Sequence, residues 1–223
     1  MAKVIIAPSI LAANFLHLED EIKRVENSGA TWLHFDVMDG HFVNNISFGI
    51  PVLKAINNKT HLVKDVHLMI SEPKKYAKAF IDAGADIITF HLEALEGEKE
   101  IVELIDLIKQ EGKQVGISIK PNTEVEKLFP YLSLIDLVLI MSVEPGFGGQ
   151  EFMINATTKI LKLKEYMANN KNLNFVIEVD GGINDVTGPI CVFYGADVLV
   201  AGTYLFNAHD MKAALNKLII KND

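Results

Sequence analysis

The stretch Gly29-Ala30-Thr31-Trp32-Leu33-His34-Phe35-Asp36-Val37-Met38 contains the junction from which this chain is built. In it, a Gly-Ala pair precedes an apolar and aromatic run of strand length. A glycine at this point can end a helix in the left-handed conformation, and the small alanine allows close packing. The same pair precedes two other apolar runs, at residues 84–85 and 195–196. We therefore interpret the pair as the junction between a helix and the strand that follows it.

Eight apolar runs of strand length occur along the chain, and amphipathic stretches with helical spacing lie between them. Leu18, Ile22 and Val25 are one example of that helical spacing. The runs are almost continuously hydrophobic, as expected for parallel strands that are covered on both faces. The expected strands are residues 4–10, 32–38, 63–70, 87–93, 114–120, 137–143, 174–180 and 198–203.

The spacing of the Gly-Ala pairs gives the number of repeating units. The first and second pairs lie 55 residues apart (84 − 29), and the second and third lie 111 residues apart (195 − 84). Counted in expected strands, these distances correspond to two and four strand-and-helix units. A unit of about 28 residues fills the 223 residues eight times. We therefore predict an α/β protein with one (β/α)8 TIM barrel domain over residues 1–223. An open doubly wound sheet is the alternative, but it does not require such even spacing, and no Gly-x-Gly-x-x-Gly follows the first strand.

The composition excludes several classes of protein. Twenty-one Lys and Arg residues against 29 Asp and Glu give a net charge of −8, which argues against a nucleic-acid or membrane-surface partner. The single cysteine, Cys191, cannot form an internal disulfide or a multi-cysteine metal site. No apolar run is long enough for a signal peptide or a membrane span, so we expect a cytoplasmic protein. A phosphate ligand remains compatible with the charge, because backbone amides can bind it locally.

Two ionisable side chains on one expected strand indicate where the site lies. His34 and Asp36 are two residues apart and share a face, whereas their neighbours Leu33, Phe35 and Val37 face the helices. Active sites of such barrels lie at the carboxyl ends of the strands. We therefore expect an imidazole and a carboxylate to meet inside the barrel at that end.

Two other expected strands add ligand atoms at the same end. His67 lies near the end of residues 63–70, and Asp180 ends residues 174–180. A lone strand histidine is usually a hydrogen-bonded core residue, and an aspartate ending a strand is often a helix cap. Four such residues in one barrel favour a metal site instead, because buried unpaired carboxylates are costly. Two imidazoles and two carboxylates suit one divalent cation such as Zn²⁺, Mn²⁺, Fe²⁺ or Co²⁺.

Other polar and soft side chains near strand ends give weaker signals. His91 and Glu93 fit either a pair that supports the metal ligands or a purely structural pair, and we favour the structural one. Lys120 could form a Schiff base, but a solvated or ion-paired lysine is the preferred interpretation. Three methionines either fill the core or line the site around a reacting carbon, namely Met38, Met69 and Met141.

Glycine-rich segments follow the sixth and seventh expected strands and end the eighth. Phosphate sites in this fold commonly use these loops, where backbone amides are exposed. Three such segments at one end of the barrel predict a phosphorylated ligand. The glycine-rich segments are Gly146-Phe147-Gly148-Gly149, Gly181-Gly182 and Gly202-Thr203.

The chain resembles the ribulose-phosphate 3-epimerase family in five segments, which occur in family order between Pro8 and about Phe206. This resemblance implies a (β/α)8 barrel that interconverts D-ribulose 5-phosphate and D-xylulose 5-phosphate in the pentose phosphate pathway. The segments are Ala7-Pro8-Ser9-Ile10-Leu11, His34-Phe35-Asp36-Val37-Met38-Asp39-Gly40-His41-Phe42-Val43, Asp65-Val66-His67-Leu68-Met69, Glu144-Pro145-Gly146-Phe147-Gly148-Gly149-Gln150 and Glu178-Val179-Asp180-Gly181-Gly182.

The resemblance also implies roles for individual residues. Asp36 would accept the C3 proton and Asp180 would donate one to the opposite face, with the roles exchanged in the reverse direction. One divalent metal ion per chain, bound by these two residues with His34 and His67, would stabilise the enediolate. Ser9 would contact the substrate, and the family's dimers and hexamers imply a homo-oligomer. The other substrate contacts would be His67, Gly146, Phe147, Gly148, Gly149, Asp180, Gly181, Gly182, Gly202 and Thr203.

Three competing functions remain to be considered. An epimerase for a hexulose phosphate such as allulose 6-phosphate would share the metal and both bases, although the glycine run at residues 146–149 favours the pentulose. A metal-independent barrel lyase or decarboxylase would use Asp-x-Lys-x-x-Asp, but Met38 stands where that lysine would be. A non-catalytic sugar-phosphate-binding barrel would not need two carboxylates at a metal.

Four positions depart from the family pattern. Asn14 replaces a common aspartate, and Asn44 and Leu92 replace common prolines. These three lie outside the expected metal ligands, so they affect loop stiffness and helix capping rather than the chemistry. Thr203 replaces the usual serine and keeps both an amide and a hydroxyl.

Overall fold

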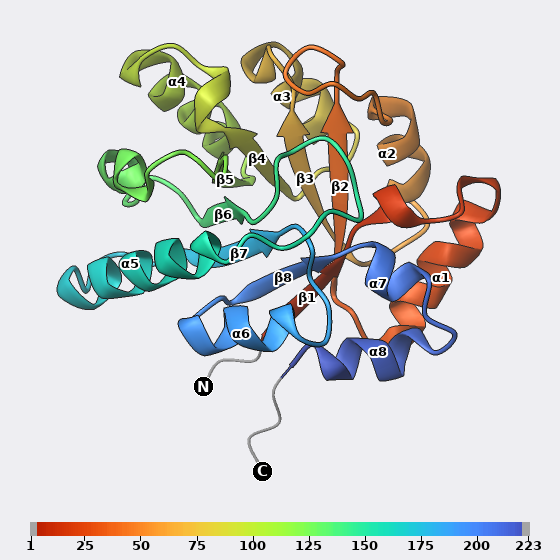
Figure 1. The fold of residues 1–223 in the computed structure, drawn as a ribbon. Coiled ribbons are helices and arrows are strands. Elements are labelled where there is room, and N and C mark those ends of the chain that lie inside the picture. Colours follow the sequence, from red (N-terminus) through yellow and green to blue (C-terminus); the bar gives the residue numbers. More distant parts are fainter. Residues whose placement is uncertain (1–3, 220–223) are drawn as a thin grey trace.

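In the computed structural model, which describes residues 4–219, eight parallel strands form a central barrel surrounded by helices (Figure 1). The predicted (β/α)8 fold is therefore confirmed for these residues; the predicted domain, 1–223, extends past them at both ends. The strands pair in the order β1-β8-β7-β6-β5-β4-β3-β2. They are β1 (Ile5–Pro8), β2 (Trp32–Met38), β3 (Val63–Met69), β4 (Ile87–His91), β5 (Gln114–Ile119), β6 (Leu137–Met141), β7 (Val176–Asp180) and β8 (Val198–Ala201).

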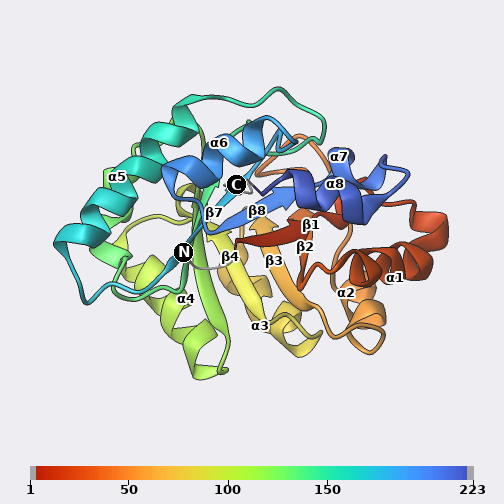
Figure 2. The same cartoon turned by 90° about the horizontal axis from the view of Figure 1, so that it is seen from below.

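Helices follow the strands and cover the outside of the barrel (Figure 2). They are α1 (Leu18–Ser28), α2 (Ile50–Asn57), α3 (Pro73–Asp82), α4 (Glu98–Gln110), α5 (Asn155–Asn169), α6 (Thr187–Tyr194), α7 (Thr203–Phe206) and α8 (Met211–Lys217). Between β5 and β6 the chain forms a 3₁₀ helix, Val125–Tyr131, with Pro130 inside it. Short 3₁₀ helices also occur at Ile10–Ala12, Phe15–His17 and Leu92–Ala94. Over residues 4–219, no helix is both long and apolar enough to cross a membrane.

The Gly-Ala pairs have the expected junction geometry. Gly29 ends α1 with φ 90°, and its N–H donates to the Glu26 carbonyl at 3.0 Å. Gly84 follows α3 with φ 113°, and its N–H donates to the Ile81 carbonyl at 2.9 Å. A positive φ of this size favours glycine over any residue with a Cβ atom. The repeated Gly-Ala pairs therefore mark the ends of helices, as the sequence predicts.

The alternation along β2 divides the apolar core from the polar interior. Leu33, Phe35 and Val37 belong to the large apolar core, whereas His34 and Asp36 are buried on the other face of the strand. The barrel closes between β1 and β2 through a parallel bridge that joins Ser9 to His34. Closure therefore brings the end of the first strand next to the polar residues of the second.

Candidate active site

A pocket of about 330 Å³ lies at the carboxyl ends of the strands, where the sequence predicts the site. Asp36 and Asp180 both line it, whereas His34 and His67 are fully buried. The structure thus brings the predicted substrate contacts and methionines together around one space. The other predicted residues that line it are Ser9, Met38, Met69, Met141, Gly146, Phe147, Gly148, Gly149, Gly181, Gly182, Gly202 and Thr203.

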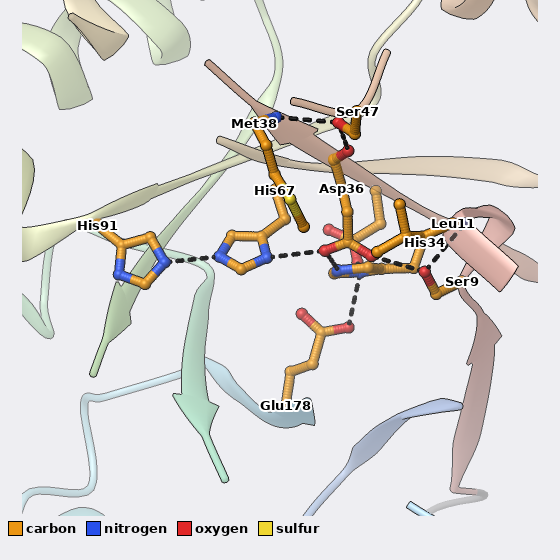
Figure 3. Close-up of polar contacts among 10 residues, drawn as sticks. Ser9, Leu11, His34, Asp36, Met38, Ser47, His67, His91 and Glu178 are labelled. Atoms are coloured by element: carbon orange, nitrogen blue, oxygen red, sulfur yellow. Dashed lines mark hydrogen bonds and ion pairs between the residues drawn. The ribbon is translucent and has the colours of Figure 1, made fainter. Parts of the chain in front are cut away.

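The four predicted metal ligands converge beside this pocket. His34, Asp36, His67 and Asp180 each offer a ligand atom, and these atoms all lie within 4.8 Å of one another. Asp36 Oδ1 is at the centre, 3.2 Å from His34 Nε2 and 3.2 Å from His67 Nδ1 (Figure 3). Two ligand atoms about 2.1 Å from one ion lie about 3.0–3.4 Å apart at octahedral or tetrahedral angles. The spacing therefore suits a single divalent cation.

His34 is oriented for such a role by a second carboxylate. Its Nδ1 lies 2.6 Å from Oδ2 of Asp65, and both side chains are fully buried. A carboxylate only accepts, so a neutral His34 has its proton on Nδ1 and its Nε2 lone pair faces Asp36. Nε2 is buried without a hydrogen-bond partner. A cation bound here would therefore satisfy the His34 Nε2 atom, which faces Asp36 and has no hydrogen-bond partner.

The buried charges of the cluster favour a positive charge at its centre. Burial alone would lower the pKa of His34, but Asp36 and Asp65 outweigh it and hold that pKa well above its usual value. Burial likewise raises the pKa of Asp36, yet His34 and His67 outweigh it and hold that pKa well below its usual range. A cation at this position would replace the proton that His34 otherwise holds, so binding should release protons.

The two pocket carboxylates have opposite proton affinities. Burial raises the pKa of Asp180 to about 7, and repulsion from Asp36 adds to the shift. Asp36 is therefore ionised at neutral pH, while Asp180 carries a proton for much of the time. A carboxylate and a carboxylic acid on one pocket can act as base and acid toward the same ligand.

Three serine hydroxyls hold the residues that carry these carboxylates, one through the carboxylate itself and two through backbone carbonyls. Ser9 Oγ donates to Asp36 Oδ2 at 2.6 Å, and Ser47 Oγ donates to the Asp36 carbonyl at 2.6 Å (Figure 3). Ser142 Oγ lies 2.9 Å from the carbonyl of Asp180 and 2.7 Å from that of Gly181. Only Ser9 was expected from the sequence. Ser47 and Ser142 follow strands β2 and β6 and had no signal of their own.

Two buried carboxylates were missed as members of the cluster. Asp65 and Glu178 share their strand faces with His67 and Asp180, two residues further along. Both are fully buried, and both oxygens of Glu178 lack a hydrogen-bond partner. Burial, together with repulsion from Asp65, raises the pKa of Glu178 well above its usual value. The alternation that identified His34 and Asp36 could have identified these two as well.

The structure also places the two other strand-end side chains, His91 and Lys120. His91 is fully buried, and its Nε2 lies 2.9 Å from His67 Nε2, so it contacts a predicted ligand (Figure 3). Burial lowers the pKa of His91 to about 4 and also lowers that of His67, which keeps both rings neutral. Lys120 Nζ lies over the Phe42 ring, 4.1 Å from its centroid, so the amino group makes a cation–π contact.

Comparison with known proteins gives one consistent result. The model of the ribulose-phosphate 3 epimerase family matches residues 5–206. A ribulose-phosphate 3-epimerase from Bacillus subtilis (strain 168) is 43% identical over 213 residues, covering 96% of this chain and 97% of the relative. One from Treponema pallidum (strain Nichols) is 45% identical over 202 residues, covering 91% of each. The crystal structure of 3-hexulose-6-phosphate synthase from Salmonella typhimurium has a TM-score of 0.73 over 96% of both chains; at 18% identity it shows the fold alone.

Proposed function

The chain belongs to the ribulose-phosphate 3-epimerase family, and on that basis we propose that it interconverts D-ribulose 5-phosphate and D-xylulose 5-phosphate by inverting C3. The observation that carries the proposal is the pair of carboxylates, Asp36 and Asp180, that line one pocket and lie within ligand distance of His34 and His67. Inversion needs a proton removed from one face and another delivered to the opposite face. One base would tend to return its proton to the same face, whereas two bases on opposite sides invert C3.

Asp36 and Asp180 would divide the proton transfer between them. Toward xylulose 5-phosphate, the ionised Asp36 accepts the C3 proton and the protonated Asp180 donates to the other face; in the reverse direction the roles exchange. The Ser9 hydroxyl holds Asp36 by its Oδ2 atom. Met38, Met69 and Met141 line the same pocket and would exclude water from the reacting carbon.

His34, Asp36, His67 and Asp180 would hold one divalent cation, of which Zn²⁺, Fe²⁺, Mn²⁺ and Co²⁺ are the candidates. When bound, the cation would supply Lewis-acid stabilisation for the negative charge that develops on the substrate oxygens. Asp65 would keep the Nε2 lone pair of His34 directed at it.

Backbone amides would hold the substrate phosphate. The glycine loops after β6, β7 and β8 border one pocket, and α7 begins at Thr203, where the first amides have no acceptor within the helix. These neutral donors attract an anion locally in a protein whose net charge is −8.

We further propose that the protein is a cytoplasmic homo-oligomer, either a dimer or a hexamer, with no nucleic-acid or membrane partner.

The test is hydrogen exchange at C3 in deuterium oxide. Asp180→Asn leaves Asp36 able to remove the C3 proton of D-ribulose 5-phosphate, so deuterium should enter that sugar while epimerisation falls about 10²- to 10⁴-fold. Asp36→Asn should instead label D-xylulose 5-phosphate. Circular dichroism and elemental analysis establish that each variant is folded and loaded. Near-normal epimerisation in either variant would contradict the two-base assignment.

Two rival functions predict different outcomes with the unmodified protein. An epimerase for a hexulose phosphate would show a higher kcat/KM on allulose 6-phosphate than on D-ribulose 5-phosphate. A non-catalytic barrel would bind the sugar phosphate and leave C3 unlabelled in deuterium oxide. We expect turnover and labelling, with preference for the pentulose.

A further inference from the structure

A second hydrogen-bonded chain leads away from the candidate cation site on the side opposite His34. His67 Nε2 lies 2.9 Å from His91 Nε2 (Figure 3). On the other side of that ring, His91 Nδ1 lies 3.2 Å from Glu93 Oε2. Both imidazoles are fully buried, and the Phe42 ring packs against His91 with centroids 4.8 Å apart. The chain of contacts therefore runs from the cluster through two buried rings to a carboxylate.

The outer end of this chain is held by the backbone. Glu93 Oε1 accepts from the Lys120 N–H at 2.8 Å and from the Thr123 hydroxyl. These bonds to the loop after β5 leave the other oxygen, Oε2, directed at His91. The carboxylate thus has a fixed position that does not depend on the metal ligands.

The donors and acceptors along the chain follow from this arrangement. A carboxylate only accepts, so the proton of a neutral His91 lies on Nδ1 and its Nε2 has a lone pair. That lone pair can only accept, so the proton of His67 lies on Nε2. His67 Nδ1 is then left with its lone pair, and this atom faces Asp36 Oδ1 at 3.2 Å. The hydrogen bonds therefore select the tautomer in which His67 can bind a cation.

We propose that Glu93 and His91 are positioning residues that fix the tautomer and ring orientation of His67 for cation binding. This inference rests on the proposed cation site, and it replaces the purely structural role favoured from the sequence. His34 and His67 would then be oriented by different groups, His34 directly by Asp65 and His67 through a second imidazole. Loss of a residue that orients a metal ligand typically weakens metal affinity about 10- to 100-fold.

The experiment measures Co²⁺ affinity of the metal-free full-length protein by competition with a chromophoric chelator. Glu93→Ala and His91→Leu should each bind Co²⁺ about 10- to 100-fold more weakly than the unmodified protein. The visible absorption of the Co²⁺-loaded protein should also change, because one ligand is no longer fixed. His91→Gln keeps an acceptor near His67 and should recover part of the affinity. Thr123→Val removes the hydroxyl bond to Glu93 but keeps the Lys120 N–H bond, so it should weaken Co²⁺ binding less than Glu93→Ala does.

The controls separate the possible causes. Glu93 is partly exposed, with 22% of its side chain accessible, so Glu93→Ala keeps the proposal testable if the buried His91 variants do not fold. Unchanged Co²⁺ affinity and absorption in folded Glu93→Ala would overturn the proposal. A larger loss in Thr123→Val than in Glu93→Ala would also overturn it, because anchoring of the loop rather than the Glu93 carboxylate would then explain the effect. If the unmodified protein binds no Co²⁺, the cation site of the proposed function fails and this inference with it.

Discussion

Replacing the glycines of two Gly-Ala junctions with alanine separates backbone strain from steric overlap. At Gly29, φ is 90° and an added Cβ would meet nothing within 4 Å, so Gly29→Ala introduces left-handed strain alone. That strain is worth about 1–2 kcal/mol of the free energy of unfolding. At Gly84, φ is 113° and an added Cβ would lie 2.1 Å from Cγ of Asn57. Because the Asn57 amide ends a half-exposed side chain that can turn away, Gly84→Ala should cost this strain and about 0.5–1.5 kcal/mol more for an off-rotamer Asn57.

The assay is urea unfolding followed by far-ultraviolet circular dichroism. Gly84→Ala should lower the free energy of unfolding by about 1.5–3.5 kcal/mol and Gly29→Ala by about 1–2 kcal/mol. Combining Gly84→Ala with Asn57→Ala removes the overlapping atoms, so relative to Asn57→Ala alone the cost should return to that of Gly29→Ala. Equal costs for the two glycine variants, or no recovery in the double variant, would refute the reasoning.

Two further predictions concern the thiol and the Ser9 hydroxyl. Cys191 is fully buried, and burial raises the pKa of its thiol to about 12, so the reactive thiolate is disfavoured below that pH. A thiol-specific reagent at pH 8 should label it only after urea unfolding, and rapid labelling of the folded protein would contradict its burial. Ser9→Ala removes the 2.6 Å bond to the Asp36 carboxylate, which is worth about 1.5–3 kcal/mol, and should lower kcat/KM about 10- to 100-fold. Ser9→Thr keeps the hydroxyl as a control, and an unchanged kcat/KM in Ser9→Ala would remove Ser9 from the site.

The fold could be predicted because its signals are local. A glycine that ends a helix and an alanine that packs beneath the next strand recur at a fixed spacing, and Gly29 and Gly84 have the positive φ that this interpretation needs. The alternation of His34 and Asp36 with apolar neighbours similarly follows from strand geometry alone. Both arguments use patterns along the chain and need no contact between strands.

The supporting contacts could not be predicted because they join different strands. His91 meets His67 through the pairing of β3 with β4, in which His67 is opposite Thr89. Ser9 reaches Asp36 because the barrel closes between β1 and β2. Such registers depend on loop lengths and packing across the whole barrel, which the spacing of residues along one strand does not specify.

Conversion of D-ribulose 5-phosphate by the purified protein, before and after removal of divalent ions, tests the central claim most directly. The account predicts that D-xylulose 5-phosphate forms, that a chelator abolishes this conversion, and that Zn²⁺, Fe²⁺, Mn²⁺ or Co²⁺ restores it. Elemental analysis of the active protein should find one divalent ion per chain. The absence of conversion under every condition, or full activity without a divalent ion, would contradict the account.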